Sequence, residues 1–179
     1  MISIAPLAVD GFEIVARWIS KPDINRWLSG DWRDKDSTAT TIAIAVRNRK
    51  NRLFLVSYEG RACGLVALSD IDHSDKTAMV WYLLGEDSLT GKGIVTEAVA
   101  QLVAFAFEKM ALESLYAWAM ECNAPSVRVL GKAGFRPAGR IRRSANMAGQ
   151  QVDRLYFDCI QSDLAATAPN YNAPGRISI

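Results

Sequence analysis

Apolar residues near the start of the chain recur at the spacing of an amphipathic helix. One helical face is formed by five apolar positions: Phe12, Ile14, Val15, Trp18 and Ile19. Pro22 ends this helix, and residues 2–8 before it have the pattern of a short strand. A second short helix is predicted over residues 23–28, and a third from a cap at Asp36 or Ser37 to about residue 49.

The pattern becomes extended after residue 51. Three apolar segments separated by short polar turns follow one another: LFLVSY, ACGLVALSDI and TAMVWYLL. Strands joined by such short turns predict an antiparallel meander. The next segment, IVTEAVAQLVAFAFEKM at residues 94–110, is apolar on nearly every side and predicts a helix packed deeply against that sheet.

The last part of the chain predicts a strand, a helix and a hairpin. Residues 114–120 form the strand and residues 123–134 the helix, which begins with a proline near its first turn and ends at a glycine. Two closing strands are predicted over residues 135–143 and 151–160, joined by residues 144–150.

The composition fits one globular domain, because 50% of the 179 residues are hydrophobic and 22% are charged. We predict this domain over residues 1–162 and a flexible C-terminal tail over residues 163–179, where Pro, Asn and Gly are frequent. A formal charge of +2 is too small to indicate a nucleic-acid partner. Neither a membrane-spanning run nor a signal-peptide pattern is present, so we expect a soluble, cytoplasmic protein without a membrane partner.

Cysteine and histidine usage argues against disulfides and metal sites. Cys63, Cys122 and Cys159 lie far apart and include no CxxC pair. We expect each to be a small buried residue in a reducing compartment. The single histidine, His73, excludes a histidine-based metal cluster, and we expect no metal cofactor.

The segment TGKGIVTEAV, residues 90–99, has the composition of a phosphate-binding loop, although a tight turn before a helix would share it. Gly91 and Gly93 leave the backbone bare where the first N–H groups of a helix lack an intrahelical partner, so an anion can approach them. Two known loops do not fit. A Walker loop needs four residues before its Gly-Lys pair, whereas five separate Gly85 from Gly91, and a dinucleotide fingerprint needs glycine at Thr96.

Three segments resemble the GNAT superfamily of N-acetyltransferases, in its ribosomal-protein-acetylating and amino-sugar-acetylating branch. IAPLAVDGFEIVARWISKPDINRWL is similar to the opening of that branch, TGKGIVTEAV to its pyrophosphate loop, and NAPSVRVLGKAGFRPAGRIR to its Asn-x-x-Ser helix. The resemblance covers about residues 2–160. It implies an α/β (α+β) fold with a mixed, mostly antiparallel central sheet flanked by helices, and acetyl-CoA as co-substrate.

The resemblance also implies which residues contact acetyl-CoA: Leu83, Leu84, Leu89, Thr90, Gly91, Lys92, Gly93, Ile94, Asn123 and Ser126. Main-chain N–H groups at the helix start would hold the pyrophosphate, and Asn123 the pantetheine arm. Leu83 or Leu84 would supply an N–H group that polarises the thioester carbonyl. Two positions depart from the family: Ser88 replaces the usual Arg or Gln, and Leu130 replaces the Tyr that reprotonates the thiolate in many members.

Acetyl transfer also needs a group that takes a proton from the amine. Six residues are candidates for this base: Asp70, Asp72, His73, Glu86, Glu121 and Asp153. Glu121 is favoured because it lies two residues before Asn123, and Asp72 because it lies at the turn between the third and fourth strands. Ser126 is a third candidate catalytic residue, near the thioester, although its hydroxyl would equally serve the start of its own helix.

The acceptor pocket is expected between the N-terminal helices and the closing hairpin. Trp27, Trp32 and Trp81 offer flat surfaces for a sugar, a base or a peptide, or else belong to the core. Arg142 is a candidate for binding an anionic acceptor. The predicted activity is acetyl transfer to a primary amine by direct attack in a ternary complex, on a protein N-terminus, an amino sugar or another small amine. The alternative is a non-catalytic acyl-CoA-binding module, and exposed edge strands would be compatible with a homodimer.

Overall fold

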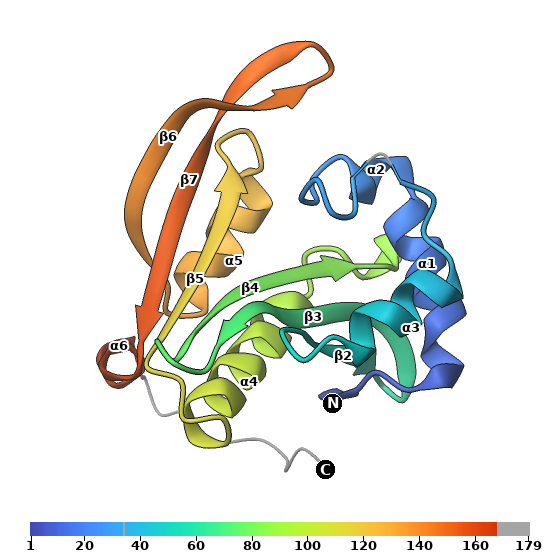
Figure 1. Cartoon of the computed structure of the whole chain (residues 1–179), viewed down its shortest axis with the longest axis horizontal. Helices are drawn as coiled ribbons and strands as arrows, with labels where there is room; N and C mark the ends of the chain where they lie inside the picture. The colour runs from blue at the N-terminus through green and yellow to red at the C-terminus, as the bar shows by residue number, and fades with distance from the viewer. Residues whose placement is uncertain (34, 168–179) are drawn as a thin grey trace.

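The centre of the molecule is a seven-stranded sheet (Figure 1), in a computed structural model that describes residues 1–33 and 35–167. The strands are β1 (Ile2–Pro6), β2 (Arg52–Tyr58), β3 (Arg61–Asp72), β4 (Thr77–Leu84), β5 (Ser114–Met120), β6 (Arg136–Met147) and β7 (Gln150–Ile160). Their order is β1-β2-β3-β4-β5-β7-β6, and each neighbouring pair is antiparallel except β4 and β5. The predicted mixed, mostly antiparallel sheet is confirmed.

Helices cover both faces of this sheet (Figure 1). The helical segments are η1 (Val9–Gly11), α1 (Phe12–Ser20), α2 (Pro22–Asn25), α3 (Ala39–Arg47), η2 (Asp87–Leu89), α4 (Ile94–Glu108), α5 (Ala124–Lys132) and α6 (Gln161–Thr167). Side chains of α1 and α3 pack against one face, and side chains of α4 and α5 pack against the other. The sheet is therefore the middle layer of three.

Strand β3 contributes to the apolar cores on both faces. Leu65 and Ala67 pack with α1 and α3, whereas Val66 and Leu68 pack with α4. All four side chains are fully buried. Since successive side chains of a strand point to opposite faces, a continuous apolar strand is what a sheet covered on both sides requires.

Strands β4 and β5 pair only at their beginning. The parallel ladder joins Thr77, Ala78 and Met79 to Ser114, Leu115 and Tyr116, and no later pairs follow. Figure 1 shows the two strands diverging from this start. The sheet therefore opens toward the ends of β4 and β5, where backbone groups on the facing edges lack a strand partner.

The closing hairpin is longer than predicted. Its strands pair as far as Met147 with Gln150, around a two-residue turn at Ala148 and Gly149, both with positive φ. The predicted seven-residue connection, residues 144–150, is thus mostly strand. The first eight residues of β6 are all exposed, so this edge strand lacks the apolar alternation that identifies a half-buried strand.

Two further predicted boundaries shift. The third helix is capped by Thr38, whose hydroxyl accepts a hydrogen bond from the Thr41 N–H at 3.3 Å, and not by Asp36 or Ser37. The predicted start of the tail at residue 163 falls inside α6, and residues 168–179 lie outside the described residues. In the described part of the chain, no helix is both long and apolar enough to cross a membrane.

Candidate functional site

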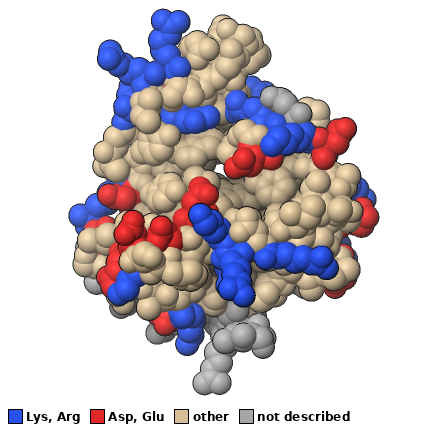
Figure 2. Space-filling view, viewed as in Figure 1, with Lys and Arg blue, Asp and Glu red and all other residues tan. Residues whose placement is uncertain are grey.

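A cavity of about 630 Å³ lies where β4 and β5 part. Its walls include Trp81, which packs with the core under α1 and α3, and Tyr82, which packs with the core under α4. Because these neighbours on β4 point to opposite faces, the cavity extends to both faces of the sheet. Figure 2 shows the surface hollowed near the middle of the molecule. A site of this kind can bring together two ligands that approach from opposite faces.

The glycine loop forms one end of the cavity. Gly91 and Gly93 have φ values of +83° and +76°, which residues other than glycine rarely adopt. Gly93 precedes the first turn of α4, and the cavity is lined here by Thr90, Gly91, Gly93, Ile94, Val95 and Thr96. The first N–H groups of a fifteen-residue helix have no intrahelical partner, so this end presents donors to an anion.

One strand N–H group faces the gap between β4 and β5. Gly85 N donates to Cys63 O at 2.8 Å, and β4 continues in antiparallel register with β3 through Leu84 opposite Gly64. Bonding alternates along such a ladder, so Leu83 N–H points to β3 and Leu84 N–H points away from it. Of the two predicted carbonyl-polarising donors, the geometry leaves Leu84, and Leu83 is excluded because its N–H belongs to the sheet.

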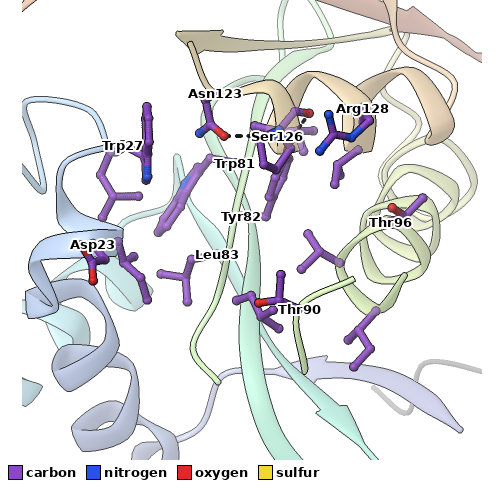
Figure 3. Close-up of a pocket in the computed structure, with 18 of the residues that line it drawn as sticks. Asp23, Trp27, Trp81, Tyr82, Leu83, Thr90, Thr96, Asn123, Ser126 and Arg128 are labelled. Carbon is purple, nitrogen blue, oxygen red and sulfur yellow. Dashed lines mark hydrogen bonds between the residues drawn. The ribbon is translucent and has the colours of Figure 1, made fainter. Parts of the chain in front are cut away.

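Ser126 and Tyr82 meet in the middle of the cavity (Figure 3). The Tyr82 hydroxyl lies 2.7 Å from Ser126 Oγ and 3.0 Å from Ser126 O, and its single hydrogen can be donated to either oxygen. Burial raises the pKa of Tyr82 to about 12, against a smaller lowering by the hydrogen bond to Ser126. The phenol therefore stays protonated at neutral pH and can donate. Tyr82 was missed from the sequence because it lies 44 residues from Ser126.

The start of α5 is held in place by its cap. Asn123 Oδ1 accepts a hydrogen bond from Ser126 N at 3.2 Å, and both residues line the cavity. Two basic residues one turn apart on α5, Arg128 and Lys132, also line it, and Figure 3 shows Arg128 on the same side as Thr90 and Thr96. Lys92 does not line it, because its Nζ lies 5.8 Å from the centre of the Tyr58 ring.

The two acids predicted to act as bases do not reach the cavity. The carboxylate of Asp72 closes its own turn by accepting hydrogen bonds from the N–H groups of Asp75 and Ser74, which lower its pKa. Glu121 Oε2 accepts from Arg140 Nη2 at 2.8 Å on the closing hairpin. We therefore correct both assignments, because each carboxylate is engaged outside the cavity.

The other candidate bases also lie outside the cavity: Asp70, His73, Glu86 and Asp153. Glu86 Oε1 accepts a hydrogen bond from the Trp18 indole at 3.1 Å. The pKa of Asp153 is lowered, first by the Arg143 N–H group and then by the Arg140 guanidinium, both of which donate to it. The carboxylates of Glu86 and Asp153 therefore accept hydrogen bonds that join separate elements of the fold.

The remaining wall contains aromatic side chains and one acid. The predicted residues Trp27, Trp32 and Trp81 line it, together with Asp23 and Trp118, which were not predicted from the sequence. Figure 3 shows Asp23, Trp27 and Trp81 on one side of the cavity, and Thr90, Thr96 and Arg128 on the other. The alternation of β5 could have identified Trp118 as a wall residue.

Arg142 and the cysteines are placed differently from the prediction. Arg142 is exposed on β6 and does not line the cavity, so its predicted contact with the acceptor is corrected. Figure 2 shows Lys and Arg side chains gathered at the upper end of the molecule, where the hairpin lies. Cys63 and Cys159 are buried as expected, but Cys122 is exposed and lines the cavity. Among the described residues, no group of three or more His, Cys, Asp or Glu could hold a metal ion.

Comparisons with known proteins agree with this architecture. A model of the acetyltransferase (GNAT) domain matches residues 2–136. Two provisionally named Bacillus subtilis proteins are similar over 106 residues: the N-acetyltransferase YjcK at 35% identity and the ribosomal N-acetyltransferase YdaF at 28%. Each match covers 59% of this chain and less than two thirds of the relative, 58% of YjcK and 57% of YdaF.

A solved structure is similar over nearly the whole fold. The spermidine N-acetyltransferase from Vibrio cholerae, in complex with CoA and spermine, superposes with a TM-score of 0.82. The alignment covers 92% of this chain and 98% of that one, at 16% sequence identity. At this identity the likeness concerns the fold.

Proposed function

Because the chain belongs to the GNAT acetyltransferase family, whose co-substrate is acetyl-CoA, we propose that it transfers the acetyl group to a primary amine by direct attack in a ternary complex. The observation that carries this proposal is the cavity itself, which joins the glycine loop on one side to a separate aromatic wall on the other. Within the family we assign the chain to the ribosomal-protein-acetylating and amino-sugar-acetylating branch, a grouping by motif that leaves the acceptor open. The similarity to YdaF supports this assignment.

In the proposed reaction, the cofactor end holds acetyl-CoA through backbone donors and basic side chains. The N–H groups at the start of α4 would bind the pyrophosphate, with Arg128 and Lys132 adding positive charge. Leu84 N–H, free of a strand partner, would donate to the thioester oxygen as negative charge develops there. Nine of the ten residues predicted to contact acetyl-CoA line this cavity, and Lys92 is the exception.

Attack by the neutral amine forms a C–N bond and breaks the C–S bond, leaving the electron pair on sulfur while the amine proton passes to water. We assign the Ser126 hydroxyl to the leaving sulfur as the donor of a hydrogen bond, with the Tyr82 hydroxyl donating to Ser126 Oγ. Full proton transfer from a phenol of pKa about 12 to a thiolate of pKa about 8.5 would cost roughly 5 kcal/mol. The pair therefore stabilises the thiolate without having to protonate it. In this role it would take the place of the Tyr that many family members have at the position of Leu130.

Calorimetry with acetyl-CoA and CoA tests the cofactor end. Gly91→Val should weaken binding at least about tenfold, because the new side chain and the change of backbone conformation close the approach to the helix N–H groups. Gly60→Val is a matched control. Gly60 also has positive φ, at +77°, and open space around it, but it lies in the turn between β2 and β3, outside the cavity.

Three results are informative. Loss of binding in Gly91→Val but not in Gly60→Val supports the cofactor end. Absence of binding by the wild-type protein overturns it. Binding without formation of any N-acetylated amine favours the non-catalytic acyl-CoA-binding module. Product should be measured by mass spectrometry, since the exposed thiol of Cys122 in the cavity would react with a thiol reagent.

A further inference from the structure

The end of the cavity opposite the glycine loop is built mainly from indole rings. We call it the aromatic end and define it by four tryptophans: Trp27, Trp32, Trp81 and Trp118. They come from four separate places: the turn after α2, the following loop, β4 and β5. The rings of Trp32 and Trp81 lie 5.6 Å apart, centre to centre, at 41° to each other. All four are partly exposed, so the cavity offers indole surface to a ligand.

Carboxylates are sparse at the aromatic end, and guanidinium groups lie over two of its rings: Arg26 over Trp27 at 4.8 Å and Arg154 over Trp118 at 4.5 Å. Among the described residues that line the cavity, Asp23 carries the only carboxylate, and it is exposed. The basic lining residues, Arg128 and Lys132, belong to α5 at the cofactor side. Figure 3 shows Asp23 on the same side as Trp27 and Trp81. An ammonium group entering here therefore meets one carboxylate and the indole rings of Trp32 and Trp81, beside the two rings that arginines already cover.

We propose that the acceptor is a monoamine carried on a flat apolar body, such as an arylalkylamine. Its ring would lie among the indoles of the aromatic end, and Asp23 would pair with the ammonium form as it enters. This inference rests on the proposed acetyl transfer and names its substrate class. Indole faces attract both apolar rings and cations, which matches a ligand that combines the two.

Other amine classes fit this wall less well. A polyamine carries several ammonium groups, and each one brought out of water needs a partner, whereas one carboxylate is present among the described lining residues. An amino sugar presents hydroxyl groups that lose affinity when they are desolvated without hydrogen-bond partners. Beside Asp23, the aromatic end offers few such partners, with Ser29 the nearest in sequence.

Intrinsic fluorescence provides a test of amine binding that does not depend on turnover. Four of the five tryptophans line the cavity, while Trp18 is buried and bonded to Glu86. The protein, saturated with CoA, is titrated with phenethylamine, spermidine, glucosamine and a tripeptide amide. We expect phenethylamine to change the fluorescence and to bind at least about tenfold more tightly than the others.

Two variants locate the binding site. Trp27→Leu should weaken phenethylamine binding about tenfold, and it spares folding because Trp27 belongs to neither core. Asp23→Asn should also weaken it about tenfold. Asp31→Asn is the control: it removes an exposed carboxylate that follows Trp27 closely in the sequence but lies outside the cavity, so it should leave phenethylamine binding unchanged. Neither cavity variant should change the Kd for CoA.

The outcomes separate this inference from the proposed function. Binding of phenethylamine that depends on Asp23 and Trp27 supports the inference, whether or not an N-acetylated amine forms. Binding without formation of that product counts against acetyl transfer and not against the inference. Preferred binding or acetylation of spermidine, glucosamine or the peptide overturns the inference while leaving acetyl transfer intact. Failure of all four amines to bind, or equal effects of Asp23→Asn and Asp31→Asn, also overturns it.

Discussion

The pairing of Tyr82 with Ser126 leads to a prediction about kcat. Tyr82→Phe keeps the aromatic ring and its packing but removes the hydroxyl that lies 2.7 Å from Ser126 Oγ. The serine hydroxyl then loses the partner that orients it. We expect kcat to fall while the KM for acetyl-CoA stays close to that of the wild type, because the hydrogen bond to sulfur strengthens only as the thiolate forms.

The size of the effect can be worked from the geometry. A serine side chain without its partner samples three staggered rotamers, so it is correctly oriented about a third of the time, a loss of roughly 0.65 kcal/mol. Loss of polarisation along the hydrogen-bonded pair adds a few tenths more. The total, about 1 kcal/mol, corresponds to about a fivefold lower kcat. Ser126→Ala removes the donor itself and should lower kcat by about 10².

The assay is the steady-state rate of N-acetyl product formation for wild type, both single variants and the double variant. Since Tyr82 acts through Ser126, the double variant should be no slower than Ser126→Ala alone. Independent, additive losses would contradict a role of Tyr82 through Ser126, as would an unchanged kcat in Tyr82→Phe. Because the pKa of Tyr82 is raised to about 12, kcat should show no alkaline decline near pH 10. A decline there that Tyr82→Phe abolishes would contradict the raised pKa.

Three other predictions concern stability and cofactor binding. Gly85→Ala should lower the free energy of unfolding, measured in urea, by about 1–3 kcal/mol. The reason is that a Cβ there would lie 2.1 Å from the buried ring of Trp18. Gly139→Ala is the control and should leave the stability unchanged, because a Cβ at Gly139 would have no atom within 4 Å. The folded-state pKa of Asp153 is lowered, so its stabilisation is present above its unfolded pKa and should be lost as pH falls below about 4; Asp153→Asn should flatten that part of the pH–stability curve. Arg128→Ala should raise the Kd for CoA several-fold and reduce its dependence on salt, as measured by calorimetry at two ionic strengths.

Most of the fold was predictable because its apolar pattern is strong. The strands between Arg52 and Leu84 appear as apolar runs separated by short polar turns, and the helix from Ile94 as a long run that is apolar on nearly every side. The end of β6, residues 144–147, was assigned to the connection because it lies in the segment SANMAGQ, whose small and polar residues are typical of a turn. An edge strand of this kind is held by backbone hydrogen bonds, which leave no mark on the sequence.

The candidate site was predictable where it depends on local backbone. The loop can be recognised from Gly91 and Gly93, because a positive φ at these positions restricts the choice of residue. The acids were not predictable, since the partner of Glu121 is Arg140, nineteen residues away across the hairpin. Asp23 was missed for the same reason: its short helix gives no sign that it faces a cavity completed by β4 and α4.

The parting of β4 from β5 has a consequence for exchange of amide hydrogens with solvent. In a continuous sheet, the N–H groups of adjacent mid-strand residues are all protected, whereas here Leu83 N–H is bonded to β3 and Leu84 N–H faces the opening. Without ligand, Leu84 should therefore exchange much faster than its neighbour, as a loop residue would. A ligand that bonds to this edge would slow it, so deuterium uptake at one strand position would report occupancy of the site.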